Sequence, residues 1–217
     1  MIECVLFDLD GVLVDACEWH YDALNQALKQ VAGTSITREE HVTTFNGLPT
    51  NEKLKILTAQ KRLDPELHKL VWERKQDLTE NVIENSAQKD DLKIDLLVGL
   101  AELGIKVGCV TNSIRKTATM MLELTGQISF IENLLTNEDV EIPKPNCEGY
   151  EKAMSIFKVE PSKTLIVEDS EKGFQAAKSS NAHVLRVSGP QDVNFENIKV
   201  TIEKINSSTE TQNILSL

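Results

Sequence analysis

Short runs of apolar residues recur along the chain and alternate with amphipathic segments. Four runs rich in β-branched residues predict strands, at residues 2–7, 105–110, 163–168 and 182–187. Between them, apolar residues at three- and four-residue intervals predict helices at 93–103, 114–125, 147–157 and 171–180. Such alternation is typical of right-handed βαβ units. The pattern therefore predicts an α/β fold with a three-layer, Rossmann-like core built on a parallel sheet.

Residues 16–88 break this alternation, because they hold amphipathic patterns and no convincing strand. Helices are predicted at 18–31, 50–62 and 65–83. The stretch is therefore expected to form a small helical domain, inserted into a core made of residues 1–15 and 89–217. Beyond residue 189 the pattern weakens. There the segment 197–205 is interpreted as a last edge strand, and the polar tail after Asn206 is expected to fray.

Composition narrows the class of protein. A chain of 217 residues with 41% hydrophobic content can bury a real core. Its four cysteines lack metal-ligand spacing and are interpreted as free thiols. The net charge of -11 argues against a nucleic-acid partner. No apolar run approaches the roughly 18 residues of a membrane span, and the N-terminus is unlike a signal peptide. We expect a cytoplasmic monomer without a membrane partner.

Polar residues follow three of the predicted strands and one loop. The groups are Asp8, Asp10 and Gly11; Thr111, Asn112 and Ser113; Glu168, Asp169 and Ser170; and Lys144 before Pro145. Because the carboxyl ends of parallel strands meet at one edge, these groups should converge. Clustered carboxylates repel one another unless a cation is present, and hard oxygen ligands suit Mg²⁺.

The chemistry that this set predicts is phosphoryl transfer. Asp8 can attack phosphorus and form an aspartyl phosphate. Asp10 can give a proton to the leaving oxygen and later take one from water. Thr111 and Lys144 can hold the phosphoryl oxygens. Magnesium would be held by Asp8, the backbone carbonyl of Asp10, Glu168 and Asp169.

The motifs DLDGV, VTNS, KP and VEDS, in this order, resemble the four signature motifs of the haloacid dehalogenase-like hydrolase superfamily over essentially the whole chain. The long interval between the first two resembles the subfamily with a helical cap inserted after the first strand. The resemblance implies that Asp8 is the nucleophile and Asp10 the acid/base. It makes Thr111 and Lys144 phosphate ligands, and Asp169 with Glu168 completes the magnesium site. Dehalogenases lack an acid at the position of Asp10, so phosphate esters are favoured.

Within the superfamily, the chain resembles the phosphatase and beta-phosphoglucomutase group. The triplet Glu18-Trp19-His20 and the loop at 46–54 are similar to substrate-facing segments of that group, and 73–79 resembles its cap lysine segment. Thr50 stands where the mutase has an arginine for a second phosphate, although Lys53 or Lys75 could partly substitute. The expected substrate-binding residues are Gly11, His20, Gly47, Thr50, Lys75, Asn112 and Ser113.

Structural roles compete with several of these assignments. Asp8 and Asp10 suit a turn, and Glu168-Asp169 suits a helix cap. Thr111-Asn112 is expected to cap the helix at 114–125 as well as to bind phosphate. Lys144 and Lys75 would ordinarily be solvated. Among functions, a magnesium-dependent phosphatase acting on a small phosphorylated metabolite, such as a sugar phosphate, is preferred. A hexose-phosphate mutase and a non-catalytic phospho-ligand-binding protein are the alternatives. The sequence leaves the substrate open.

Overall fold

A single parallel sheet organises the protein. The computed structural model describes the backbone of residues 1–215 and the side-chain surroundings of residues 1–208. The strands are β1 (Cys4–Phe7), β2 (Lys106–Val110), β3 (Asn133–Leu135), β4 (Thr164–Glu168) and β5 (His183–Arg186). Their order in the sheet is β3-β2-β1-β4-β5. Four of them lie where the sequence predicts strands. The sequence analysis missed β3, because three residues are too few for a recognisable pattern.

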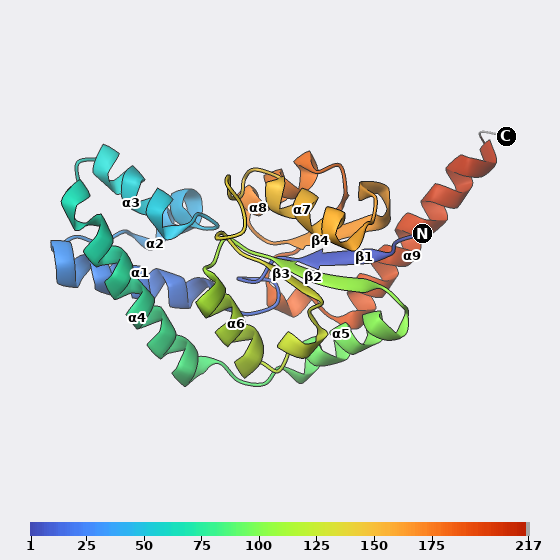
Figure 1. The fold of residues 1–217 in the computed structure, drawn as a ribbon, viewed down its shortest axis with the longest axis horizontal. Coiled ribbons are helices and arrows are strands. Elements are labelled where there is room, and N and C mark those ends of the chain that lie inside the picture. Colours follow the sequence, from blue (N-terminus) through green and yellow to red (C-terminus); the bar gives the residue numbers. More distant parts are fainter. Residues whose placement is uncertain (216–217) are drawn as a thin grey trace.

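Helices cover both faces of the sheet (Figure 1). Val5 and Phe7 of β1 point to a cluster shared with α5 (Asp91–Glu102), α6 (Arg115–Leu124) and α9 (Phe195–Leu215). Cys4 and Leu6 point to the opposite face, which α7 (Glu148–Phe157) and α8 (Glu171–Ser179) cover. This alternation follows from the two-residue period of a strand. The three-layer α/β fold is thus confirmed.

The prediction of a last edge strand at 197–205 was wrong, because this segment lies within helix α9. Ile198 and Ile202 are buried against the sheet cluster, and Ile205 packs beside them. Their spacing of four and three residues marks one face of a helix, which outweighs the strand preference of the β-branched side chains. The same helix extends to Leu215, so the backbone after Asn206 is helical rather than frayed.

Residues 16–88 are helical and contain no strand. The long helices are α1 (Cys17–Ala32), α3 (Thr50–Ala59) and α4 (His68–Ser86); the short α2 (Arg38–Glu40) leads into a π-helical turn at His41–Phe45. Further 3-10 turns lie at Pro65–Leu67, Ile128–Phe130, Pro161–Lys163 and Pro190–Asp192. Residues of the helical segment share their own hydrophobic cluster. Figure 1 shows this segment beyond the carboxyl ends of the strands.

No helix in the described part of the chain is both long and apolar enough to cross a membrane.

Candidate active site

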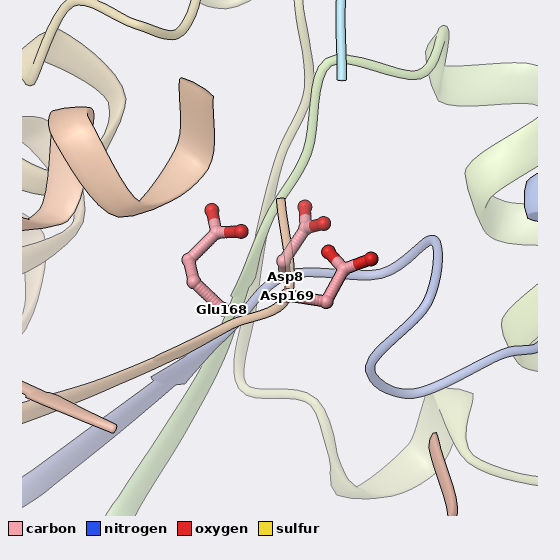
Figure 2. Close-up of side chains that lie close together, drawn as sticks. All are labelled: Asp8, Glu168 and Asp169. Atoms are coloured by element: carbon pink, nitrogen blue, oxygen red, sulfur yellow. The ribbon is translucent and has the colours of Figure 1, made fainter. Parts of the chain in front are cut away.

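The central strand β1 places Asp8 in the middle of the sheet edge. Phe7 pairs with Cys109 of β2 on one side and with Val167 of β4 on the other. The next residues, Asp8 and Glu168, therefore end neighbouring strands at the same level. Figure 2 shows the carboxyl groups of Asp8, Glu168 and Asp169 close together above the strand ends. Parallel register thus brings together acids that are 160 residues apart in the sequence.

Lys144 ties two of these acids together. Its Nζ donates to Asp8 Oδ1 at 2.8 Å, to Glu168 Oε1 at 2.6 Å and to the Val110 carbonyl at 2.7 Å. Burial disfavours the ammonium, but attraction to Asp8 and Glu168 overcomes this and raises the pKa of Lys144. With its side chain only 6% exposed, Lys144 is a buried cation and not the solvated loop lysine of the competing interpretation.

The three carboxylates carry more negative charge than Lys144 neutralises. Ligand oxygens of Asp8, Glu168 and Asp169 all lie within 4.8 Å of one another. Burial and repulsion from Asp8 raise the pKa of Glu168 to about 8 and that of Asp169 to about 7. Glu168 Oε2 and Asp169 Oδ1 are buried without a hydrogen-bond partner among the described residues. Orphaned hard oxygens at this spacing fit a divalent cation such as Mg²⁺.

Two glycines and a tyrosine shape this cluster. Tyr150 donates its hydroxyl to Glu168 Oε1. A Cβ at Gly173 would lie 2.0 Å from Glu168 Oε2, and one at Gly11, where φ is +88°, would lie 2.2 Å from Asp169 Oδ2. Both glycines therefore make room for an acid. The sequence analysis missed Tyr150 and Gly173, because a tyrosine in an amphipathic helix is indistinguishable from ordinary core.

Asp10 lies outside the acidic cluster and has partners of its own. His20 Nε2 lies 2.9 Å from its Oδ1, and the Ser113 hydroxyl donates to its Oδ2 at 2.7 Å. The Thr111 hydroxyl is 3.5 Å from the same Oδ2. Burial would raise the pKa of Asp10, but His20, Ser113 and the charge of Lys75 outweigh it and lower the pKa to about 2. Asp10 was expected to bind magnesium through its backbone carbonyl. This role remains compatible with the contacts of its side chain to His20 and Ser113.

A cavity separates the sheet edge from the helical segment 16–88. Its lining includes the following predicted site residues: Asp8, Asp10, His20, Gly47, Thr50, Lys75, Thr111, Asn112, Ser113 and Lys144. Gly11, Glu168 and Asp169 are not among the lining residues. The Asn112 amide donates to the Gly47 carbonyl at 2.7 Å and to the Lys144 carbonyl at 3.1 Å. Asn112 therefore joins the loop of the helical segment to the sheet edge.

The prediction that Thr111-Asn112 caps a helix was wrong, and Glu168-Asp169 does not form a helix cap either. The N-cap position of α6 is Ile114, and no side chain caps that helix there. Thr111 Oγ1 instead accepts from the Ser113 backbone N–H at 3.0 Å. The N-cap of α8 is Ser170, whose hydroxyl accepts from Gly173 N–H at 3.1 Å. Neither Thr111 nor the acids at the end of β4 are needed to start a helix.

Two lysines of the helical segment are buried at the cavity. Lys53 on α3 is 7% exposed and Lys75 on α4 is 6% exposed, and both line the cavity. Lys75 Nζ lies 3.1 Å from Nδ1 of His20. Burial lowers the pKa of Lys53 to about 8 and, with repulsion from Lys53, that of Lys75 to about 7. Lys75 is therefore not on a solvated face, and Lys53 joins the site.

Comparison with known families fits this geometry. A profile of haloacid dehalogenase-like hydrolases matches residues 5–187, a range that holds the sheet edge, Lys144 and the helical segment. The chain belongs to the haloacid dehalogenase-like hydrolase family and is an enzyme of the phosphatase type.

The chain is also similar to named proteins and to solved structures within this family. It is 30% identical over 177 residues to pyrophosphatase PpaX of Anoxybacillus flavithermus, covering 82% of this chain and 79% of that one. It is 27% identical to validoxylamine A 7'-phosphate phosphatase of Streptomyces hygroscopicus subsp. limoneus, with 82% of each chain covered. The fold is similar to that of beta-phosphoglucomutase from Clostridium difficile, with a TM-score of 0.83 and 24% identity over 96% and 99% of the two chains.

Proposed function

We propose that this protein is a magnesium-dependent phosphatase that hydrolyses a small phosphate monoester, such as a sugar phosphate, through an aspartyl-phosphate intermediate. The observation that carries the proposal is the position of Asp8. Its carboxylate lines the cavity, is bound by Lys144 and shares a cation-sized cluster with Glu168 and Asp169. A nucleophile, a fixed positive charge and an acid/base candidate thus border the same space.

In the first proposed step, a carboxylate oxygen of Asp8 attacks phosphorus while the bond from phosphorus to the ester oxygen breaks. Asp10 gives its proton to that leaving oxygen. The phosphoryl group brings negative charge next to Asp10, which raises its pKa toward the protonated form that this step needs. In the second step, water attacks phosphorus, Asp10 takes the proton and the bond to Asp8 breaks. Lys144 and the Thr111 hydroxyl would bind the phosphoryl oxygens.

Mg²⁺ would be held by Asp8, Asp169, the Asp10 carbonyl and Glu168, the last directly or through water. The ion would supply positive charge between an anionic nucleophile and an anionic phosphate. Residues 16–88 would act as the cap domain that excludes bulk water from the cavity. His20, Gly47, Thr50 and Lys75 would then contact the part of the substrate that leaves.

The relatives support a small phosphorylated substrate, because their names include a pyrophosphatase and a phosphatase of a phosphorylated metabolite. A hexose-phosphate mutase is the second candidate. Thr50 in place of an arginine argues against it, whereas the buried Lys53 and Lys75 give the cap positive charge that a second phosphate could use.

A panel of phosphorylated metabolites tests the proposal, with released phosphate measured with and without Mg²⁺. We expect turnover that stops in excess EDTA and falls about 10³-fold or more in Asp8→Asn, which removes the nucleophile. Thermal unfolding should show that this variant remains folded. Full turnover by Asp8→Asn, or in excess EDTA, would contradict the mechanism. A mutase would convert a hexose phosphate into its isomer, with stimulation by a sugar bisphosphate and little phosphate release.

A further inference from the structure

The end of the π-helical turn His41–Phe45 is held by a lysine that belongs to the sheet core. Lys172 Nζ, on α8, donates to the carbonyl of Thr44 at 3.0 Å and to that of Asn46 at 3.1 Å. The last carbonyls of a helix lack donors within the helix itself, so they need partners from elsewhere. Lys172 therefore completes a turn that belongs to the helical segment 16–88.

The backbone that follows this turn lies directly against the core. The Asn112 amide, which follows β2, donates to the Gly47 carbonyl at 2.7 Å. The φ angle of Gly47 is +74°, and a Cβ there would lie 3.0 Å from the Ser170 hydroxyl oxygen and 3.7 Å from Lys172 Cβ. Residues 46–50 all line the cavity. Two side chains from separate strand ends thus hold a loop that forms part of the cavity wall.

The first turn of α8 is an unfavourable place for a cation. Lys172 is the second residue of this helix, where the positive end of the helix dipole repels an ammonium group. Its neighbour Glu171 pairs with Arg186, whose Nη2 lies 3.0 Å from Glu171 Oε2. Lys178 is exposed in the last turn of the same helix, where a cation is favoured. The place of Lys172 is therefore explained by its contacts to the helical segment and not by its own helix.

We propose that Lys172 is a positioning residue, which latches residues 44–47 to the core and so sets the shape of the cavity. Lys172 is not among the described residues that line the cavity, so it acts through the loop and not on the substrate. The latch requires no particular reaction, whereas its effect on turnover rests on the proposed phosphatase function. If the latched loop is the form that binds substrate, the apparent dissociation constant rises as the latched fraction falls. Loss of the latch should then raise KM more than it lowers kcat.

Amide hydrogen exchange of the full chain tests the latch without any substrate. In Lys172→Met, the amides of residues 41–50 should exchange about tenfold faster, because the turn loses two hydrogen bonds from a charged group. Amides of β1 and β4 should keep their wild-type protection. Lys178→Met is the matched control and should leave exchange unchanged. Lys172→Arg keeps the charge and several donors, so it should restore slow exchange. If Lys172→Met does not fold, Lys172→Gln, which is too short to span both carbonyls, takes its place.

Steady-state kinetics tests the effect on turnover, with a phosphate monoester that the panel of phosphorylated metabolites shows to be hydrolysed. Lys172→Met should raise KM about fivefold or more and change kcat by about twofold or less, and Lys172→Arg should recover the wild-type KM.

Unchanged exchange of residues 41–50 in Lys172→Met would overturn the latch, and so would faster exchange spread over the whole protein. Faster local exchange with an unchanged KM would overturn the positioning role. If wild type hydrolyses no monoester while Lys172→Met shows the faster local exchange, the latch stands and the proposed phosphatase function fails.

Discussion

The two sides of the cavity treat buried charge in opposite ways. On the sheet side, Lys144 is in contact with two carboxylates and a carbonyl, and the three clustered acids carry more negative charge than this one ammonium neutralises. On the side of the helical segment 16–88, Lys53 and Lys75 are buried without a contact to a carboxylate of the described residues. The sheet side of the cavity therefore carries excess negative charge, and the opposite side carries unpaired positive charge. A divalent cation would balance the negative charge of the sheet side, and a polyanionic substrate would balance the positive charge of the lysines.

Because of this contrast, the net charge of the chain does not indicate the charge of its binding site. The chain carries a formal charge of -11, which gives no indication of a local site for an anion. That total hides a positive wall in the one cavity where the proposed substrate would bind. The sign of a binding site is a local property, because burial lets two lysines dominate their surroundings.

The largest effect that we predict comes from removing the compensated cation. Lys144→Met would leave Asp8 and Glu168 buried without their partner and should lower the free energy of unfolding by about 3–5 kcal/mol. Urea unfolding at pH 7 measures this loss. Lys163→Met is the control, because its pair with Glu3 lies at the surface and is worth about 1 kcal/mol or less. If the two variants lost similar stability, the charge balance described for the sheet edge would be wrong.

Much of the fold could be predicted from the sequence, and its failures have local causes. Strands β1 and β4 are buried along their whole length and β2 nearly so, and continuous buried runs of this kind are a strong signal in a parallel sheet. The segment 197–205 misled because Val200 and Ile202 favour strands while the spacing of Ile198, Ile202 and Ile205 is helical. β3 is too short to recognise, yet its Leu135 carbonyl accepts from Thr111 N–H and so holds the second motif in place.

Whereas Lys144→Met is expected to destabilise the protein, replacing the buried Lys75 is expected to stabilise it. Burial and repulsion from Lys53 lower the pKa of Lys75 to about 7, partly opposed by Asp10, whereas an unfolded lysine has a pKa near 10.4. Between these values the unfolded chain binds more protons, so the free energy of unfolding rises with pH; below about pH 7 both states are protonated and the full cost remains. Lys75→Met should therefore stabilise the protein at pH 6.5, by on the order of 1–2 kcal/mol.

That gain should shrink as the pH rises toward 10. Urea unfolding of both proteins at several pH values measures it, and the nearby groups are His20, Lys53 and Asp10. Lys69→Met, whose side chain is 86% exposed on the same helix, serves as the control and should show no such trend. A constant difference between wild type and Lys75→Met, or a destabilised variant at pH 6.5, would mean that Lys75 is not a strained buried cation.

The sheet-side half of the candidate site could be predicted from topology, whereas His20, Gly47, Thr50 and Lys75, which also line the cavity, were expected only from the family resemblance. Asp8, Asp10, Thr111 and Lys144 directly follow strands or precede a helix, so topology alone brings them together. The opposite wall of the cavity depends on how helices α3 and α4 pack, and the periodicity of one sequence does not reveal which lysines of a charged helix turn inward. Lys75 stands beside Arg74 in the sequence, yet Arg74 is bound to Gln30 while Lys75 is buried at the cavity.

The smallest predicted effect comes from a charge pair that spans the same two regions in solvent. Lys116 of α6 lies 2.7 Å from Glu80 of α4, with side chains 68% and 24% exposed. A double-mutant cycle with Lys116→Met and Glu80→Gln should give a coupling of about 1 kcal/mol or less, and salt at about 0.5 M should abolish it. A coupling as large as the loss expected for Lys144→Met, and insensitive to salt, would break the comparison. The strength of a charge pair would then depend more on its bridging α4 and α6 than on its burial.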